Sequence, residues 1–276
     1  MTSLPASQGS GSLTGRSSRY VLRGAAGVDV PADVVDFGTG RPVVFLHGLV
    51  GLNDHWEEVA QRIAHRCRCV MLQLPLLRLV GDDCSIQGAT ELTGRFLKEY
   101  FGGPTVLVGN SFGGHVALRL AIERRELLSG LVLAGSSGLI EKTMMSDIQI
   151  RPSRAWLERK IGELFHDKAR MSEADVERAF KELSDRAHAR AMIRLSRTAR
   201  RNHLGDLIST IACPTLLLWG RQDIVTPPEA AYELKAKIRD SRLVWFDQCG
   251  HAPMIEAPEA FGDALNAFLD ELDQRA

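Results

Sequence analysis

The chain has 276 residues, of which 45% are hydrophobic, and it carries 34 Lys and Arg residues against 34 Asp and Glu residues. This length and apolar content are sufficient for the full core of a single α/β domain. The zero formal net charge excludes a strong overall field that would attract nucleic acid or a membrane surface, and the longest apolar runs fall far short of the ~18 residues that suggest a membrane span.

The first eighteen residues differ in composition from the rest of the chain. Residues 1–18 are rich in Ser, Gly and Thr and have neither the basic segment nor the apolar segment of a signal peptide. We expect a disordered leader here. The five cysteines form an odd set without a paired zinc-binding pattern, which predicts reduced thiols and a cytoplasmic location. Because the sequence has no metal-ligand spacing, we expect no metal.

Short apolar runs, each typical of a buried strand, recur along the chain with helical segments between them. This alternation predicts a mostly parallel sheet of about eight strands with helices on both faces. Two weaker stretches, near 20–22 and 28–36, are expected to form an antiparallel leading edge. The six stronger runs are Pro42–Leu46, Val70–Leu74, Thr105–Val108, Gly130–Ala134, Thr215–Trp219 and Leu243–Phe246.

Helical patterns fill the gaps between these strands, and one gap is unusually long. Between Gly138 and Ile211 the sequence has helical periodicity and no strand candidate. Long excursions in compact domains usually have a function, although one extended crossover without a role is the alternative. The other expected helices are Asn53–Ala64, Ile86–Tyr100, Phe112–Glu123, Pro228–Ile238 and Pro258–Glu271.

Residues 109–113 have the sequence G-N-S-F-G and lie between a predicted strand and a predicted helix. A serine flanked by glycines in this setting indicates a nucleophile elbow, because the turn is sharp and leaves no space for side chains at its ends. A serine hydroxyl is a weak nucleophile at its own pKa, so Ser111 needs a base within hydrogen-bond reach and a third group that orients the base.

Two later strand ends supply candidates for these partners. Asp223 follows the strand 215–219 and a Gly turn, and His251 follows the strand 243–246 with Gly250 before it. His251 is predicted to act first as the base and later as the acid. Asp223 is predicted to hold the imidazole of His251 in the required tautomer. His47 precedes a loop glycine and is interpreted as structural. For the acid, Glu141 is the alternative, because it is nearest to the loop after the strand 130–134; Asp247 is interpreted as a surface residue.

The elbow, the two strand ends and their Ser…Asp…His order resemble the α/β-hydrolase superfamily across roughly residues 18–274. Members of this superfamily commonly insert a helical cap after the sixth strand. The resemblance therefore implies a cap at residues 141–206 over a core formed by 19–140 and 207–276. It also implies an oxyanion hole made by the backbone N–H groups of Phe112 and, from the loop after the third strand, Leu49.

Within the superfamily, the elbow and the segments before Asp223 and His251 are similar to those of C–C bond hydrolases that act on aromatic meta-cleavage products. This similarity implies that Asn110 and a cap arginine, for which Arg178 is near the expected place, bind substrate. Two departures count against it: Ala252 stands where those enzymes usually have Trp, and Arg178 is only approximately placed. Residues 73–76 also replace the D-x-P-G that follows the fourth strand in many relatives.

From this resemblance we expect a cofactor-independent serine hydrolase that cleaves a small carboxylic ester through an acyl-enzyme. The alternatives are a C–C bond hydrolase of a meta-cleavage dienoate and a small-molecule binding module with little turnover. The expected partner is a small-molecule substrate, with no nucleic acid and no membrane; the sequence does not indicate an oligomeric state.

Five arginines of the cap recur at three- and four-residue steps on one helix face. This pattern indicates a solvated outer surface or, alternatively, a surface that attracts an anion. The five are Arg186, Arg190, Arg194, Arg197 and Arg201.

Overall fold

The computed structural model describes residues 15–141 and 151–275. Its centre is one eight-stranded sheet in the order β1-β2-β4-β3-β5-β6-β7-β8. The first two pairings of this order are antiparallel and the remaining five are parallel, so the predicted mostly parallel sheet with an antiparallel leading edge is confirmed. The strands are β1 Arg16–Arg23, β2 Asp29–Gly38, β3 Arg41–Leu46, β4 Cys67–Gln73, β5 Thr105–Asn110, β6 Leu128–Ala134, β7 Thr215–Gly220 and β8 Ser241–Phe246.

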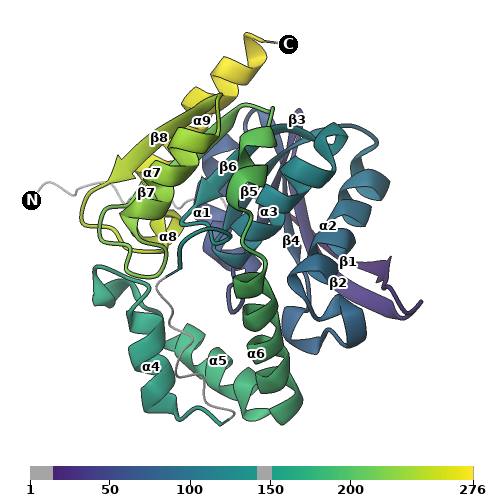
Figure 1. Cartoon of the computed structure of the whole chain (residues 1–276), viewed down its shortest axis with the longest axis vertical. Coiled ribbons are helices and arrows are strands. Elements are labelled where there is room, and N and C mark those ends of the chain that lie inside the picture. The colour runs from purple at the N-terminus through teal and green to yellow at the C-terminus, as the bar shows by residue number, and fades with distance from the viewer. Residues whose placement is uncertain (1–14, 142–150, 276) are drawn as a thin grey trace, which may run out of the picture.

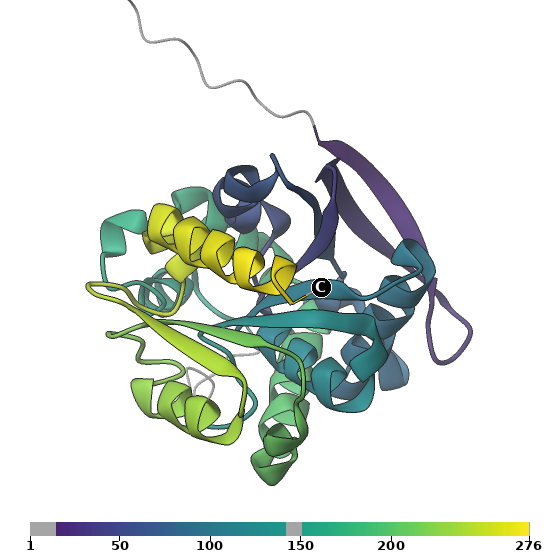
Figure 2. The same cartoon turned by 90° about the horizontal axis from the view of Figure 1, so that it is seen from above.

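Helices cover both faces of the sheet (Figures 1 and 2). The central strands are apolar on both sides: Val106 and Val108 of β5 belong to one core cluster, and Leu107 between them belongs to the other. The first of these clusters packs against α1, α8 and α9, and the second against α2, α3 and α7. The helices are α1 Glu57–Ile63, α2 Ile86–Phe101, α3 Phe112–Glu123, α4 Arg154–Gly162, α5 Glu173–Ser184, α6 Arg186–Arg201, α7 Pro228–Lys237, α8 Pro253–Glu256 and α9 Pro258–Asp273.

The N-terminal boundary differs from the one that the composition suggested. Strand β1 begins at Arg16, so Ser17 and Ser18 belong to the sheet, where they lie opposite Val35 and Val34 of β2. Backbone pairing at a sheet edge tolerates polar side chains that face solvent, so a Ser-rich composition does not mark the boundary of the folded part of the chain. The remainder of the expected leader, residues 1–14, lies outside the described residues.

The interval between β6 and β7 contains α4, α5 and α6, and no strand lies in its described parts, residues 135–141 and 151–214. Figure 1 shows these three helices together at one end of the molecule, below the sheet. A small apolar cluster joins them through Trp156, Leu157, Leu183 and Met192. Residues 142–150, which belong to the expected cap, lie outside the described residues.

The topology brings the predicted site residues to one edge of the sheet. Parallel strands end at the same edge, and in α/β folds ligands bind outside these carboxyl ends. Ser111 follows β5, Asp223 follows β7 and His251 follows β8. The chain also leaves this edge after β6 to form α4–α6, which places the three helices over the same strand ends (Figure 1).

Candidate active site

Ser111 occupies a strained turn between β5 and α3. Its φ is 53° and its ψ is −117°, a conformation that costs a non-glycine residue on the order of 1–3 kcal/mol. The turn requires glycine on both sides: a Cβ built on Gly109 would lie 2.5 Å from the Gly113 carbonyl oxygen, and one on Gly113 would lie 2.5 Å from that of Leu46. The turn leaves the Ser111 side chain at the wall of a cavity.

His251 and Asp223 form a buried pair on the two neighbouring loops. The Nδ1 atom of His251 lies 2.9 Å from Oδ2 of Asp223, and the two residues are 4% and 2% exposed. The other carboxylate oxygen, Oδ1, accepts backbone hydrogen bonds from Val225 at 2.8 Å and Thr226 at 2.9 Å. A carboxylate held on both oxygens is fixed in the orientation that a histidine partner requires.

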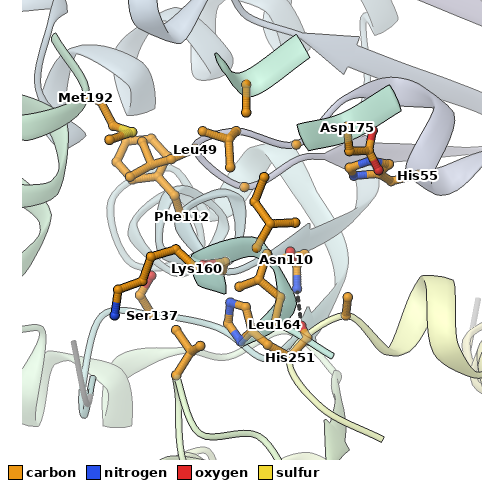
Figure 3. Close-up of a pocket in the computed structure, with 18 of the residues that line it drawn as sticks. Leu49, His55, Asn110, Phe112, Ser137, Lys160, Leu164, Asp175, Met192 and His251 are labelled. Atoms are coloured by element: carbon orange, nitrogen blue, oxygen red, sulfur yellow. Dashed lines mark hydrogen bonds and ion pairs between the residues drawn. The ribbon is translucent and has the colours of Figure 1, made fainter. Parts of the chain in front are cut away.

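The cavity beside Ser111 has a volume of about 170 Å³. His251 and Ser111 both line it, together with many apolar side chains of α4–α6 (Figure 3). The lining residues from these helices include Trp156, Leu157, Ile161, Leu183 and Met192. A mostly apolar cavity next to a hydroxyl and an imidazole suits a small organic molecule.

Two backbone segments meet at the predicted oxyanion hole. Phe112 is the first residue of α3, so its N–H has no carbonyl partner within the helix. The loop after β3 lies against the elbow, since a Cβ built on Gly48 would be 3.4 Å from Ser111 Cβ. Leu49 and Phe112 both line the cavity, and Figure 3 shows them near each other.

Asn110 lies at the cavity wall, but its amide group is bonded to the protein backbone. Its Nδ2 donates to the carbonyl of Ala134 at 2.9 Å and to the carbonyl of His251 at 3.0 Å, the second of which is the dashed line in Figure 3. Both amide hydrogens are therefore used to join β5, β6 and the His251 loop. Asn110 also lines the cavity, so its predicted substrate-binding role stays a prediction.

Arg178 is not brought to the cavity. Its guanidinium pairs with Asp175 on the same helix and lies 3.8 Å from Asp54, and it lines a neighbouring pocket that shares residues 49–51 with the cavity. Side chains three residues apart on a helix are neighbours, so Asp175 draws Arg178 along the α5 surface. The substrate-binding role implied for Arg178 therefore has no support in this geometry.

The alternative residues considered from the sequence have other surroundings. Glu141 lines the cavity, whereas Asp223 is the acid in contact with His251. His47 is buried, and its Nδ1 lies 2.7 Å from the Gly48 carbonyl, to which a neutral imidazole donates. Burial disfavours its charged form and lowers the pKa of His47 to about 4. Asp247 is exposed and pairs with Arg221.

Three titratable residues of the cavity were not singled out from the sequence. His55, next to α1, lies 3.4 Å from Asp175 of α5, and Figure 3 shows this pair at one side of the cavity. The His55 imidazole, and then Arg178, hold the pKa of Asp175 below its ordinary value. Lys160 of α4 lies at another side, and its Nζ is 3.0 Å from Glu163. Helix side chains reach a cavity only through tertiary packing, so periodicity alone could not identify them.

Glu256 of α8 joins the His251 loop to the segment after α4. One of its carboxylate oxygens accepts the backbone N–H of Gly250 at 2.7 Å, and the other accepts those of His166 at 2.8 Å and Asp167 at 3.1 Å. His251 itself donates its backbone N–H to the Leu164 carbonyl at 2.7 Å. The backbone of His251 is therefore fixed by the segment that also encloses the cavity.

This fold, with a serine elbow after β5 and an acid and a histidine after β7 and β8, corresponds to a known class of hydrolases. Residues 43–264 match the model of the Alpha/beta hydrolase family. The chain belongs to this family, and the predicted superfamily and fold are confirmed. Among residues 15–141 and 151–275, no helix has both the length and the apolar character needed to cross a lipid bilayer.

Individual relatives within the family differ in the reactions that their names describe. The 2-hydroxy-6-oxo-6-(2'-aminophenyl)hexa-2,4-dienoic acid hydrolase of Metapseudomonas resinovorans is 27% identical over 271 residues, 91% of this chain and 92% of the relative. The pimeloyl-[acyl-carrier protein] methyl ester esterase of Nitrosomonas europaea is 26% identical over 253 residues, 84% of this chain and 96% of the relative.

A solved structure of a hydrolase is also similar to this chain. A serine hydrolase involved in carbazole degradation has a TM-score of 0.78 and 26% sequence identity, and the match covers 92% of this chain and 99% of that chain. Hydrolases of both ester and C–C bonds are thus similar to this chain over nearly its whole length, and the chain itself is a hydrolase of this superfamily.

Proposed function

We propose that this hydrolase is a cofactor-independent serine esterase that cleaves a small carboxylic ester through an acyl-enzyme on Ser111. The observation that carries the proposal is the position of Ser111 on the same cavity as His251, whose Nδ1 is 2.9 Å from the buried carboxylate of Asp223. In the proposed mechanism His251 takes the Ser111 proton and later gives it to the leaving alcohol. Asp223 keeps the proton of the neutral imidazole on Nδ1.

The oxyanion of the tetrahedral intermediate would be bound by the backbone N–H groups of Leu49 and Phe112. These dipoles are fixed by the loop after β3 and by the start of α3, so they need no reorganisation when negative charge develops. Water then attacks the acyl-enzyme with His251 as the base, and Ser111 is released. Residues 141–206 would act as a cap that excludes bulk water from this cavity.

An ester is favoured over a dienoate by the charges of the cavity. Cleavage of a C–C bond in a dienoate requires groups that hold its carboxylate. Arg178 is paired with Asp175, Glu141 and Asp175 add negative charge to the lining, and Lys160 is neutralised by Glu163. The small side chain of Ala252 forms part of the wall, which leaves space for varied acyl groups.

A side-by-side measurement of kcat/KM tests this preference. We expect p-nitrophenyl acetate or butyrate to be hydrolysed faster than a meta-cleavage dienoate. The second candidate, C–C bond hydrolysis, is favoured by the relative named as a dienoic acid hydrolase. A dienoate preferred by tenfold or more, with Arg178→Ala or Lys160→Met abolishing that preference, would assign the protein to the C–C hydrolases.

A binding module with the same fold is distinguished by turnover and by covalent labelling. The proposal predicts multiple turnovers on an ester and stoichiometric modification of Ser111 by a fluorophosphonate. It also predicts that EDTA leaves the activity intact. Stoichiometric ligand binding without turnover would support the binding module, and activity lost to EDTA and restored by zinc or manganese would contradict cofactor independence.

A further inference from the structure

Thr226 lies beside the Asp223–His251 pair and has no role in the mechanism described so far. Its hydroxyl oxygen is 2.8 Å from Oδ2 of Asp223 and 3.2 Å from Nδ1 of His251. Because Nδ1 is itself 2.9 Å from Oδ2, the three atoms form a closed triangle. Thr226 is fully buried, so no bulk water competes for these contacts.

We propose that Thr226 is a positioning residue that keeps the proton of neutral His251 on Nδ1 and limits the negative charge that Asp223 presents to the imidazole. The proposal rests on the serine-hydrolase function proposed above. Thr226 touches neither the substrate nor the reacting atoms, and it acts through Asp223 and His251. Its consequence is measurable as the position of the acidic limb of the pH–rate profile.

The number of protons in the triangle determines how the hydroxyl is used. A carboxylate only accepts hydrogen bonds, so the single Thr226 hydroxyl proton is donated to Asp223 Oδ2. The hydroxyl oxygen then faces Nδ1 of His251 with lone pairs alone. Two acceptors, one from Thr226 and one from Asp223, therefore surround Nδ1, which favours a proton there and leaves Nε2 unprotonated toward Ser111.

The Thr226 hydroxyl cannot easily turn away from this position. The backbone N–H of Thr226 donates to Asp223 Oδ1 at 2.9 Å, and its carbonyl accepts the indole N–H of buried Trp219 at 2.8 Å. Pro227 follows and restricts the backbone conformation of Thr226. A β-branched side chain has few χ1 rotamers, so the fixed backbone also fixes the hydroxyl.

Removal of the hydroxyl changes the balance of charge at the imidazole. Without Thr226 as a donor, Oδ2 of Asp223 keeps more of its negative charge. Because this charged acceptor lies 2.9 Å from Nδ1 and the neutral hydroxyl acceptor that is lost lies at 3.2 Å, the gain from the carboxylate is the larger effect, and the imidazolium form of His251 gains stability relative to imidazole. The midpoint of the acidic limb of kcat/KM therefore moves to higher pH. The other titratable groups near His251 stay in place; they are Cys249 and Glu256 on its own side and His55, Glu141, Lys160 and Asp175 around the cavity.

The test compares the pH profile of kcat/KM for p-nitrophenyl butyrate in the parent, Thr226→Val and Thr226→Ser proteins. Thr226→Val keeps the shape and removes the hydroxyl, and we expect its acidic limb to move up by roughly half a pH unit or more. Thr226→Ser keeps the hydroxyl and should retain the parent midpoint. The matched control is Thr93→Val, which removes a buried hydroxyl in α2 that donates to Ala89; this change should leave the midpoint in place.

An NMR measurement keeps the proposal independent of turnover. In a Ser111→Ala background, ¹⁵N chemical shifts of neutral His251 should show the proton on Nδ1, and Thr226→Val should raise the midpoint of the imidazole titration. An unchanged midpoint in Thr226→Val, or a proton on Nε2 in the Ser111→Ala protein, would overturn the role of Thr226. The tautomer measurement is made with Thr226 in place, so it does not depend on whether a Thr226 variant folds. Full activity in Ser111→Ala would instead overturn the proposed function.

Discussion

At the scale of single residues, Asp223 is the predicted acid of the site, and its Oδ2 lies 2.9 Å from Nδ1 of His251. Replacement by Asn would present an amide donor to Nδ1 and favour the wrong tautomer. We expect Asp223→Asn to lower kcat by about 10⁴-fold while the protein stays folded. Glu141→Gln is the matched control, since Glu141 lines the same cavity whereas Asp223 is the acid in contact with the imidazole. A large loss in this variant and little loss in Asp223→Asn would identify Glu141 as the acid.

The residues at strand ends were predictable from the sequence, and those on helices were not. Ser111, Asp223 and His251 each follow a short apolar strand and a glycine, and the structure gathers them because parallel strands end at one edge. Their catalytic roles remain predictions. Arg178 was assigned to the cavity from an approximate position in the chain, but the direction of a side chain on a helix depends on its partners, here Asp175 and Asp54.

At the scale of elements, α6 combines an apolar inner face with a cationic outer face. Met192, Ser196 and Ala199 line the cavity. Six arginines are exposed, including Arg200 in addition to the five singled out from the sequence, and α6 contains no acidic residue. No ion pair to these six is present in the described part of the chain. Like charges three and four residues apart destabilise a helix.

Conversion of one of these arginines to an acid should stabilise the protein. Arg190→Glu places a carboxylate four residues from both Arg186 and Arg194, and we expect a gain of about 1 kcal/mol in the free energy of unfolding at low salt. The change also removes the exposed hydrogen bond from Arg190 Nε to the Arg186 carbonyl at 3.1 Å, a loss that Arg190→Gln shares. Urea unfolding at low and high salt measures it, with Arg190→Gln as the control for removed repulsion alone. A lower stability of Arg190→Glu at low salt would contradict this account of α6.

Most strands and helices of the core were predictable to within a few residues, because short continuous apolar runs mark the strands that are buried on both faces. Strand β1 was the exception: its pattern is mostly exposed, and backbone pairing with β2 determines its start at Arg16. For α4–α6, periodicity indicates helices but does not determine how they lie over the sheet, because their packing uses contacts between distant segments such as His55 and Asp175.

At the scale of the whole molecule, two buried histidines make stability depend on pH. Burial, which disfavours the charged form, lowers the pKa of His47 and of His115 to about 4. Below the ordinary histidine pKa of about 6.5, the unfolded chain binds protons that the folded protein does not. The stabilisation is therefore complete above about pH 6.5 and is lost as the pH falls toward about 4.

We expect the free energy of unfolding to decrease between pH 7 and pH 5 by ~2 kcal/mol for each of these histidines. The pKa values of Asp36 and Asp175 lie below 3.8, so these carboxylates do not account for a loss in this range. Urea unfolding at a series of pH values measures the slope. His115→Gln should reduce it, whereas His65→Gln, at an exposed position, should not; equal slopes in the parent and His115→Gln would contradict this assignment.

The central claim is that Ser111 is the nucleophile of an ester hydrolase, and kcat for p-nitrophenyl butyrate in Ser111→Ala tests it most directly. The variant removes one oxygen from the cavity wall, so circular dichroism should show the parent fold. The account predicts a loss of about 10⁴- to 10⁶-fold in kcat, because no other described group can form the acyl-enzyme at the elbow. A kcat within tenfold of the parent would contradict the serine mechanism.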